Sequence, residues 1–155
     1  MTLIDGESME YAKGSIGRVF TVRMDHGDDL LYELENLAKL EDIKSAVFVL
    51  LGAVREANLV VGPKESRVPP EIQWENLDEV HEIIGVGNIF LENDKPKIHL
   101  HSAAGRGKAP VVGCMRGKSE IFMVVEVFIM EISGISAIRS FDEGRGFAPI
   151  IFGSR

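Results

Sequence analysis

Residues 45–54 read SAVFVLLGAV, an almost entirely apolar run that is rich in valine. β-Branched residues favour strands, and a run that is apolar on both faces is typical of a strand buried within a sheet. The run predicts a central strand that ends near Gly52, and residues 58–61 are expected to continue the sheet after a short turn.

The segments on either side of this run predict one helix and several further strands. Residues 19–24 alternate with a period of two, as a half-buried strand does. A helix is expected to follow, with Asp28 as its N-cap and with leucines and an alanine at helical spacing on its buried side: Leu30, Leu31, Leu34, Leu37 and Ala38. Further strands are expected at residues 79–84, 87–91, 97–102 and 122–132. One helix among many strands in an irregular order predicts an α+β fold.

Length and composition predict a single compact domain that spans residues 1–155. The chain is 45% hydrophobic and 26% charged, which is ordinary for a globular protein. No secretion signal and no apolar run of transmembrane length is present, and the one cysteine excludes an internal disulfide. We therefore expect a cytoplasmic protein that does not enter a membrane. The net charge of −7 gives no overall attraction to nucleic acid.

Two histidines and the cysteine predict a metal site. Strand periodicity puts His99 and His101 on the same face of their strand, which is a chelating arrangement. Cys114 follows a glycine-rich connection, so the chain can turn and return the thiol to the histidines. Two imidazoles and a thiolate suit zinc and leave a fourth position open, although they also accept cobalt, nickel or copper. The alternatives are two strand histidines without a ligand and a cysteine that is only a small buried apolar residue.

Basic residues cluster between His101 and Glu120, where the sequence contains no acid. They are candidates for drawing an anionic ligand to the metal, or are simply solvated loop charges. The four are Arg106, Lys108, Arg116 and Lys118.

Glu126 is the candidate catalytic acid or base. It stands alone in the apolar stretch of residues 122–130, where an unpaired carboxylate would be costly to bury. We expect it either to orient an imidazole or accept a proton at the metal site, or to form an ion pair with Arg23 or Arg139.

Six segments together resemble the plant and prokaryote conserved (PPC) domain, which follows AT-hooks in plant nuclear proteins and stands alone in many bacteria and archaea. The resemblance extends over about residues 20–147, and it is carried by the order and spacing of the segments rather than by any one of them. The segments are HGDDLL at 26–31, LGAV at 51–54, EIIGVGNI at 82–89, HLH at 99–101, VEV at 125–127 and the stretch from Arg139 to Phe147.

This resemblance implies a mixed, mostly antiparallel sheet, assembly as a homotrimer, and a metal on the paired histidines. In the family a third histidine commonly follows Gly-Gly, whereas this chain has Cys114 after Val112 and Gly113. Thiolate can replace imidazole on zinc, but the departure also permits a site that has lost its metal. The fold is further similar to that of acetolactate decarboxylases, which are zinc enzymes.

Two main functional hypotheses follow. The first is a homotrimeric zinc-binding domain with an open metal site that acts on a small anionic substrate. The second is a DNA-binding or protein-interaction module of the PPC type without catalytic activity; a purely structural assembly domain is a third. The AT-hook core Arg-Gly-Arg-Pro is absent, so we expect no specific binding to duplex DNA at physiological salt.

Overall fold

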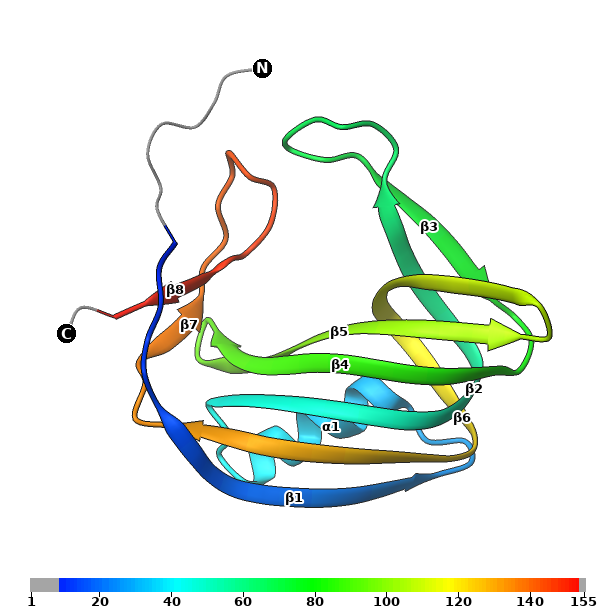
Figure 1. The fold of residues 1–155 in the computed structure, drawn as a ribbon, viewed down its shortest axis with the longest axis horizontal. Coiled ribbons are helices and arrows are strands. Elements are labelled where there is room, and N and C mark those ends of the chain that lie inside the picture. Colours follow the sequence, from blue (N-terminus) through cyan, green and yellow to red (C-terminus); the bar gives the residue numbers. More distant parts are fainter. Residues whose placement is uncertain (1–8, 154–155) are drawn as a thin grey trace.

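The structure is a computed structural model that describes residues 9–153 (Figure 1). Its elements in chain order are β1 (Ser15–Asp25), α1 (Leu30–Leu40), β2 (Ser45–Pro63), β3 (Ile72–Leu77), β4 (His81–Glu92), β5 (Lys95–Arg106), β6 (Ala109–Ser133), β7 (Ala137–Arg139) and β8 (Ile150–Phe152). The strands form one sheet, in which every strand pair is antiparallel except the parallel pair β4–β7. This architecture confirms the predicted α+β fold with one main helix and a mixed, mostly antiparallel sheet.

The sheet closes on itself around its centre. Its strands follow the order β3-β2-β6-β5-β4-β7-β8, with β1 added along β6. An additional pairing between β2 and β4 makes β2, β6, β5 and β4 a closed ring of hydrogen-bonded neighbours. β2 and β6 are long strands, and the β-bulges in their mutual pairing let them bend. Each strand can therefore pair with several neighbours along its length.

The helix covers one side of this ring and supplies much of the core. Leu30, Leu34 and Ala38 are fully buried, because they recur on one stripe of the helix. The N-cap is Asp29 rather than the predicted Asp28: the Asp29 side chain accepts a hydrogen bond from the backbone N–H of Tyr32. Within the described residues, no helix has both the length and the apolar character that crossing a bilayer requires.

β4 is one continuous strand, whereas the sequence analysis predicted two strands separated by glycines. Gly85 and Gly87 do not form a turn but lie inside the strand, where they leave room for core side chains. A Cβ atom on Gly87 would overlap the ring of Phe48, which is fully buried in the facing strand. Glycine is therefore needed here for packing rather than for backbone freedom.

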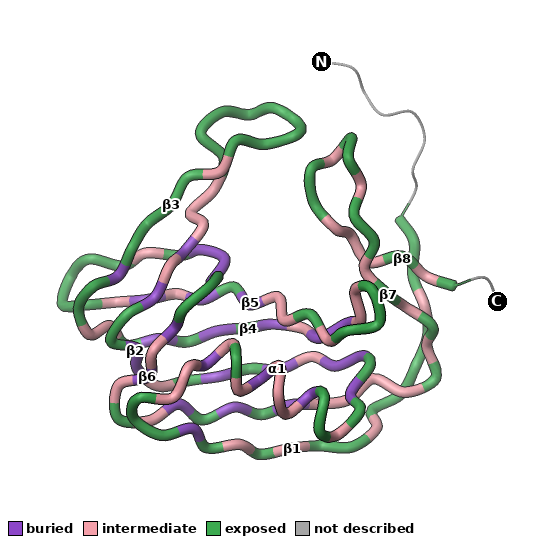
Figure 2. Tube along the Cα trace, turned by 180° about the vertical axis from the view of Figure 1, so that it is seen from behind, coloured by how far each residue is buried: buried purple, intermediate pink, exposed green. Residues whose placement is uncertain are grey.

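The sheet face that points away from α1 is apolar and exposed. Val49 lies opposite both Val86 and Phe128 in the strand ladders, and Leu51 lies opposite Ile84. These five side chains, which we call the outer face, are 38–66% exposed. Figure 2 shows buried and exposed residues alternating along these strands. A monomer thus presents a contiguous apolar surface to solvent.

Candidate metal centre

The hairpin of β5 and β6 brings the three predicted metal ligands together. Leu100 points into the core and is fully buried, so His99 and His101 project from the opposite face of β5. Cys114 lies directly opposite His101 in the ladder, and directly opposite residues share a face. The chain turns at Gly107, whose φ of 59° lies in the left-handed region that glycine favours.

The ligand atoms of this cluster are spaced as a transition metal requires. The Nε2 atoms of His99 and His101 are 3.1 Å apart, and the ligand atoms of all three residues lie within 4.8 Å of one another. Two nitrogen ligands on a tetrahedral zinc ion are separated by about 3.4 Å. The thiol is buried, His99 is half-buried and His101 is exposed. The donor set and its spacing therefore fit a zinc-like ion that is approached from one side.

His99 is held in its neutral form. Burial is the main cause that lowers its pKa from 6.5 to about 4, and the charges of Arg139, His101 and Arg116 lower it further. A neutral imidazole has a lone pair to offer, so the environment of His99 favours a ligand over a cation at neutral pH.

Arg139 contacts the ring of His99 from the other side. Its Nη2 donates to the Oδ1 of Asn88 at 2.8 Å and contacts the Nδ1 of His99 at 3.2 Å, while its Nη1 donates to the carbonyl of Ala148 at 2.7 Å. A guanidinium can only donate, so the Nδ1 of His99 accepts this hydrogen bond. The neutral ring then carries its proton on Nε2, from which it donates to the Nε2 of His101.

A metal at this site must displace that arrangement. An imidazole that binds a metal through Nε2 carries its proton on Nδ1, where it cannot accept a hydrogen bond. The hydrogen bond from Arg139 to His99 therefore has to break when the metal binds. The three ligands fit a metal, and Arg139 is the neighbour that has to adjust.

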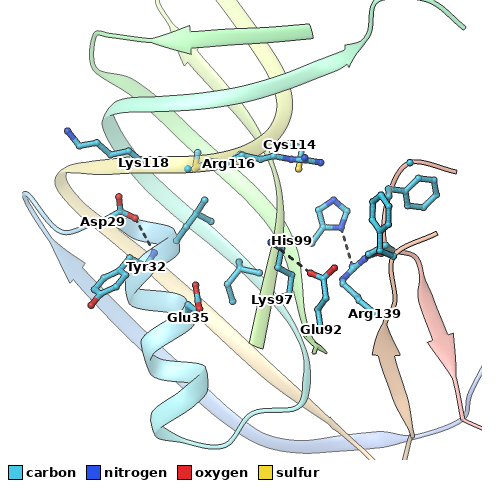
Figure 3. A pocket seen from close by; sticks show the side chains of 18 residues that line it. Asp29, Tyr32, Glu35, Glu92, Lys97, His99, Cys114, Arg116, Lys118 and Arg139 are labelled. Atoms are coloured by element: carbon cyan, nitrogen blue, oxygen red, sulfur yellow. Dashed lines mark hydrogen bonds and ion pairs between the residues drawn. The ribbon is translucent and has the colours of Figure 1, made fainter. Parts of the chain in front are cut away.

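A large pocket opens beside the cluster, as Figure 3 shows. Its volume is about 870 Å³, and His99 and Cys114 form part of its wall while His101 does not. The pocket runs from the start of α1 past the first half of β5 to the segment between β7 and β8. The pocket lies beside residues 95–99 of β5, which do not pair with β6 because the β5–β6 ladder covers only Leu100 to Arg106.

The structure separates the four basic residues that the sequence grouped together. Arg116 and Lys118 line the pocket. Arg106 and Lys108 lie instead at the tip of the β5–β6 hairpin and do not line the pocket, so the pocket gives no support to the prediction that they bind an anion at the metal. Arg106 forms an ion pair with Glu79 at 3.1 Å.

Glu126 does not line the pocket either, so the predicted catalytic role gains no support from the described chain. It is exposed rather than buried, because its side chain projects from the outer face of β6. That part of β6 pairs with β1 and β2 and not with β5, so Glu126 cannot reach the histidines. Arg23 lies opposite it but forms its ion pair with Asp25.

Two residues that surround His99, Arg139 and Asn88, were not recognised in the sequence as part of the site. Arg139 stands in a three-residue strand, and such a short element has no periodicity to read. Asn88 is directly opposite His99 in the ladder of β4 with β5. The one available signal was that both lie in segments that carried the family resemblance.

The fold and the cluster define a small, mostly antiparallel domain with a candidate transition-metal site. The model of the Plants and Prokaryotes Conserved (PCC) domain matches residues 11–133. The chain belongs to this family, as its sequence segments predicted; the matched range begins and ends earlier than the predicted 20–147. No curated protein matches the sequence significantly.

Solved structures of several prokaryotic proteins share this fold. A metal-containing protein from Archaeoglobus fulgidus is 28% identical, with a TM-score of 0.82 over 92% of this chain and 99% of that one. A PPC protein from Pyrococcus horikoshii is 23% identical, with a TM-score of 0.80 over 95% of this chain and 99% of the other. A protein from Ralstonia eutropha, described only as a candidate DNA-binding protein, is 22% identical, with a TM-score of 0.73 over 86% and 90%.

Proposed function

We propose that this chain is a zinc-binding protein of the PCC domain family, with the metal held by His99, His101 and Cys114 and with one coordination position open to a small anionic ligand. The observation that carries the proposal is the spacing of the three ligand atoms within 4.8 Å in a chain that has no other cysteine. The similarity to a metal-containing archaeal protein supports it.

The residues around the ligands have separate tasks in this proposal. Asn88 holds Arg139 by a hydrogen bond of 2.8 Å, and in the metal-free chain Arg139 in turn fixes the plane of the His99 ring until a metal displaces that contact. Leu100, fully buried between the two histidines, anchors their strand to the core. When bound, zinc supplies a Lewis acid with a free coordination position.

The metal content of the purified protein tests the proposal. We expect close to one transition-metal ion per chain in protein prepared without chelator, and loss of that metal in the double variant His99→Ala/His101→Ala. Cys114→Ser should retain the fold and bind metal more weakly, because a hydroxyl is a poorer zinc ligand than a thiolate. A double variant with undiminished metal content would disprove the site.

We further propose that the protein assembles as a homotrimer in the cytoplasm, with the outer face as the contact between subunits. The support is the apolar character of that face, on which Val86 and Ile84 are 60% and 66% exposed. His101 lies directly opposite Val86 in the ladder, so a neighbouring subunit on this face would also shield the exposed side of the metal centre.

DNA binding is the second candidate, since one protein of the same fold is described as a candidate DNA-binding protein. The distribution of charge does not favour it. The chain has a net charge of −7, and the cations Arg106 and Lys118 are each engaged by a glutamate, Glu79 and Glu56 respectively. Of the four cations in the basic stretch, Lys108 and Arg116 remain to neutralise phosphates, on which nonspecific affinity depends.

A further inference from the structure

Some charged residues that line the pocket have an oppositely charged or hydrogen-bonding partner, and others have no ion-pair partner. Each of its three carboxylates already has a partner: Asp29 accepts from the backbone N–H groups of Tyr32 and Ser119, Glu35 pairs with Lys39, and Glu92 pairs with Lys97. Lys97 and Lys118 are thereby also engaged, since Lys118 pairs with Glu56. The cations that line the pocket without a carboxylate partner among residues 9–153 are Arg116 and Arg139.

Arg139 is a half-buried cation whose Nε still lacks an acceptor. Its neighbours Asn88, Ala148 and His99 accept from Nη1 and Nη2, but all three are uncharged. Its Nε is buried and has no hydrogen-bond partner. Burial lowers the pKa of Arg139, and the charge of Glu92, which lies opposite it in the ladder of β4 with β7 but forms no ion pair with it, only partly offsets this effect. A partly buried charge of this kind is stabilised by an ionised ligand.

Arg116 approaches the same point from another strand. It follows Cys114 by two residues on β6, it is exposed, and it forms no hydrogen bond or ion pair within the described part of the chain. Its charge contributes to lowering the pKa of His99, as does that of Arg139. Both guanidinium groups line the same pocket as His99, next to the position that a metal would occupy.

The rest of the pocket wall is apolar. Phe141 and Phe147, from the segment between β7 and β8, line it while being 62% and 49% exposed. Ile98 and Met115 line it from β5 and β6. Exposed aromatic side chains around a cavity with a few convergent polar groups are typical of a small-molecule site.

We propose that this pocket binds a small carboxylic acid with an apolar body, whose carboxylate is held by Arg139 and Arg116 beside the metal ligands and whose body packs on Phe141 and Phe147. The planar guanidinium suits a carboxylate, and the apolar wall favours a hydrocarbon body over a strongly hydrated one. The inference rests on the proposed metal site, because it names the class of ligand that would reach the open coordination position.

Calorimetric titration of the zinc-loaded protein with 4-methylpentanoate tests this, with the neutral 4-methylpentanamide and inorganic phosphate as comparison ligands. We expect the acid to bind and the amide not to bind. Arg139→Met should raise the dissociation constant of the acid by about tenfold to a hundredfold, as loss of a hydrogen bond to a charged group does. Arg116→Met, a change at an exposed position that leaves folding intact, should raise it by a smaller factor. Arg106→Met is the matched control: it removes the same charge outside the pocket and should leave binding unchanged.

Zinc content measured in the same samples separates this inference from the proposed function. A wild-type protein without zinc refutes the metal proposal, whatever its affinity for the acid. A zinc-loaded protein whose affinity for the acid is unchanged in both arginine variants refutes the carboxylate site, because the metal alone would then hold the ligand. Equal binding of the amide, or tighter binding of phosphate with the same dependence on Arg139, would likewise overturn the assignment to a carboxylic acid.

Discussion

The low pKa of His99 predicts that the metal-free protein loses stability in mild acid. Imidazole in the unfolded chain titrates near 6.5, whereas His99 in the fold titrates near 4. Between these two values the unfolded chain binds a proton that the folded chain does not bind, so a falling pH favours unfolding. Above pH 6.5 both states are neutral at this residue, and the free energy of unfolding no longer depends on its titration.

The size of the effect follows from the shift and from the partial exposure of the ring. A change from 6.5 to about 4 corresponds to roughly 3 kcal/mol at 1.36 kcal/mol per pKa unit. His99 is only half-buried, and solvent screening at such a site reduces the contribution to about 1–2 kcal/mol.

Urea unfolding of chelator-treated protein at pH 7 and pH 4.5 measures this contribution. Both titrations need the same protein concentration, because an oligomer gains stability with concentration. We expect the wild type to lose about 1–2 kcal/mol more than His99→Asn between the two pH values, since the variant lacks the titrating group. Arg139→Met should show an intermediate loss, because removing that cation raises the pKa of His99. An equal loss in wild type and in His99→Asn would refute the reasoning.

Three other predictions address assembly, packing and DNA. Sedimentation should show a trimer for the wild type and smaller species for Val86→Glu, which places a charge on the outer face; a wild-type monomer at micromolar concentration would contradict the assembly. Gly87→Ala should lower the free energy of unfolding by about 1–3 kcal/mol, because its methyl group would overlap Phe48. Gly105→Ala, with no atom within 4 Å of the added Cβ, is its control. Fluorescence anisotropy should show no sequence-selective duplex binding at physiological salt, and nanomolar selective binding would promote the DNA-binding alternative.

The spacing of apolar residues predicted those helices and strands whose formation depends mainly on residues close together in the sequence. The buried run at residues 45–54 and the helical spacing of the leucines are properties of neighbouring residues, and both elements form. The division of β4 into two strands was wrong, because the need for glycine there comes from Phe48, which is more than thirty residues away in the sequence. The strands β3, β7 and β8 were missed because three to six residues carry too little periodicity.

In the candidate site, too, the residues that local spacing brings together were predicted, and those that distant pairing brings together were not. His99, His101 and Cys114 lie on one hairpin, so strand period and one turn were enough to predict that they meet. Glu126 was misplaced because the apolar run around it suggests burial, whereas its own face of the strand is exposed in the single chain. Arg139 reaches His99 only through the pairing of β7 with β4. Local periodicity does not reveal such a contact between distant segments.

The pairing of β1 with β6 has a consequence for the order in which the protein is made and folds. Arg18 and Glu131, which form an ion pair across these strands, are 113 residues apart. During synthesis β1 has to wait until residues 124–133 of β6 have left the ribosome, and pairing over such a distance is slow. The β5–β6 hairpin is complete through Cys114 well before residues 124–133 are made. The three predicted metal ligands can therefore meet on the nascent chain before the sheet closes. In pulse-labelled hydrogen exchange, amide protons of the hairpin should accordingly become protected earlier than those of β1.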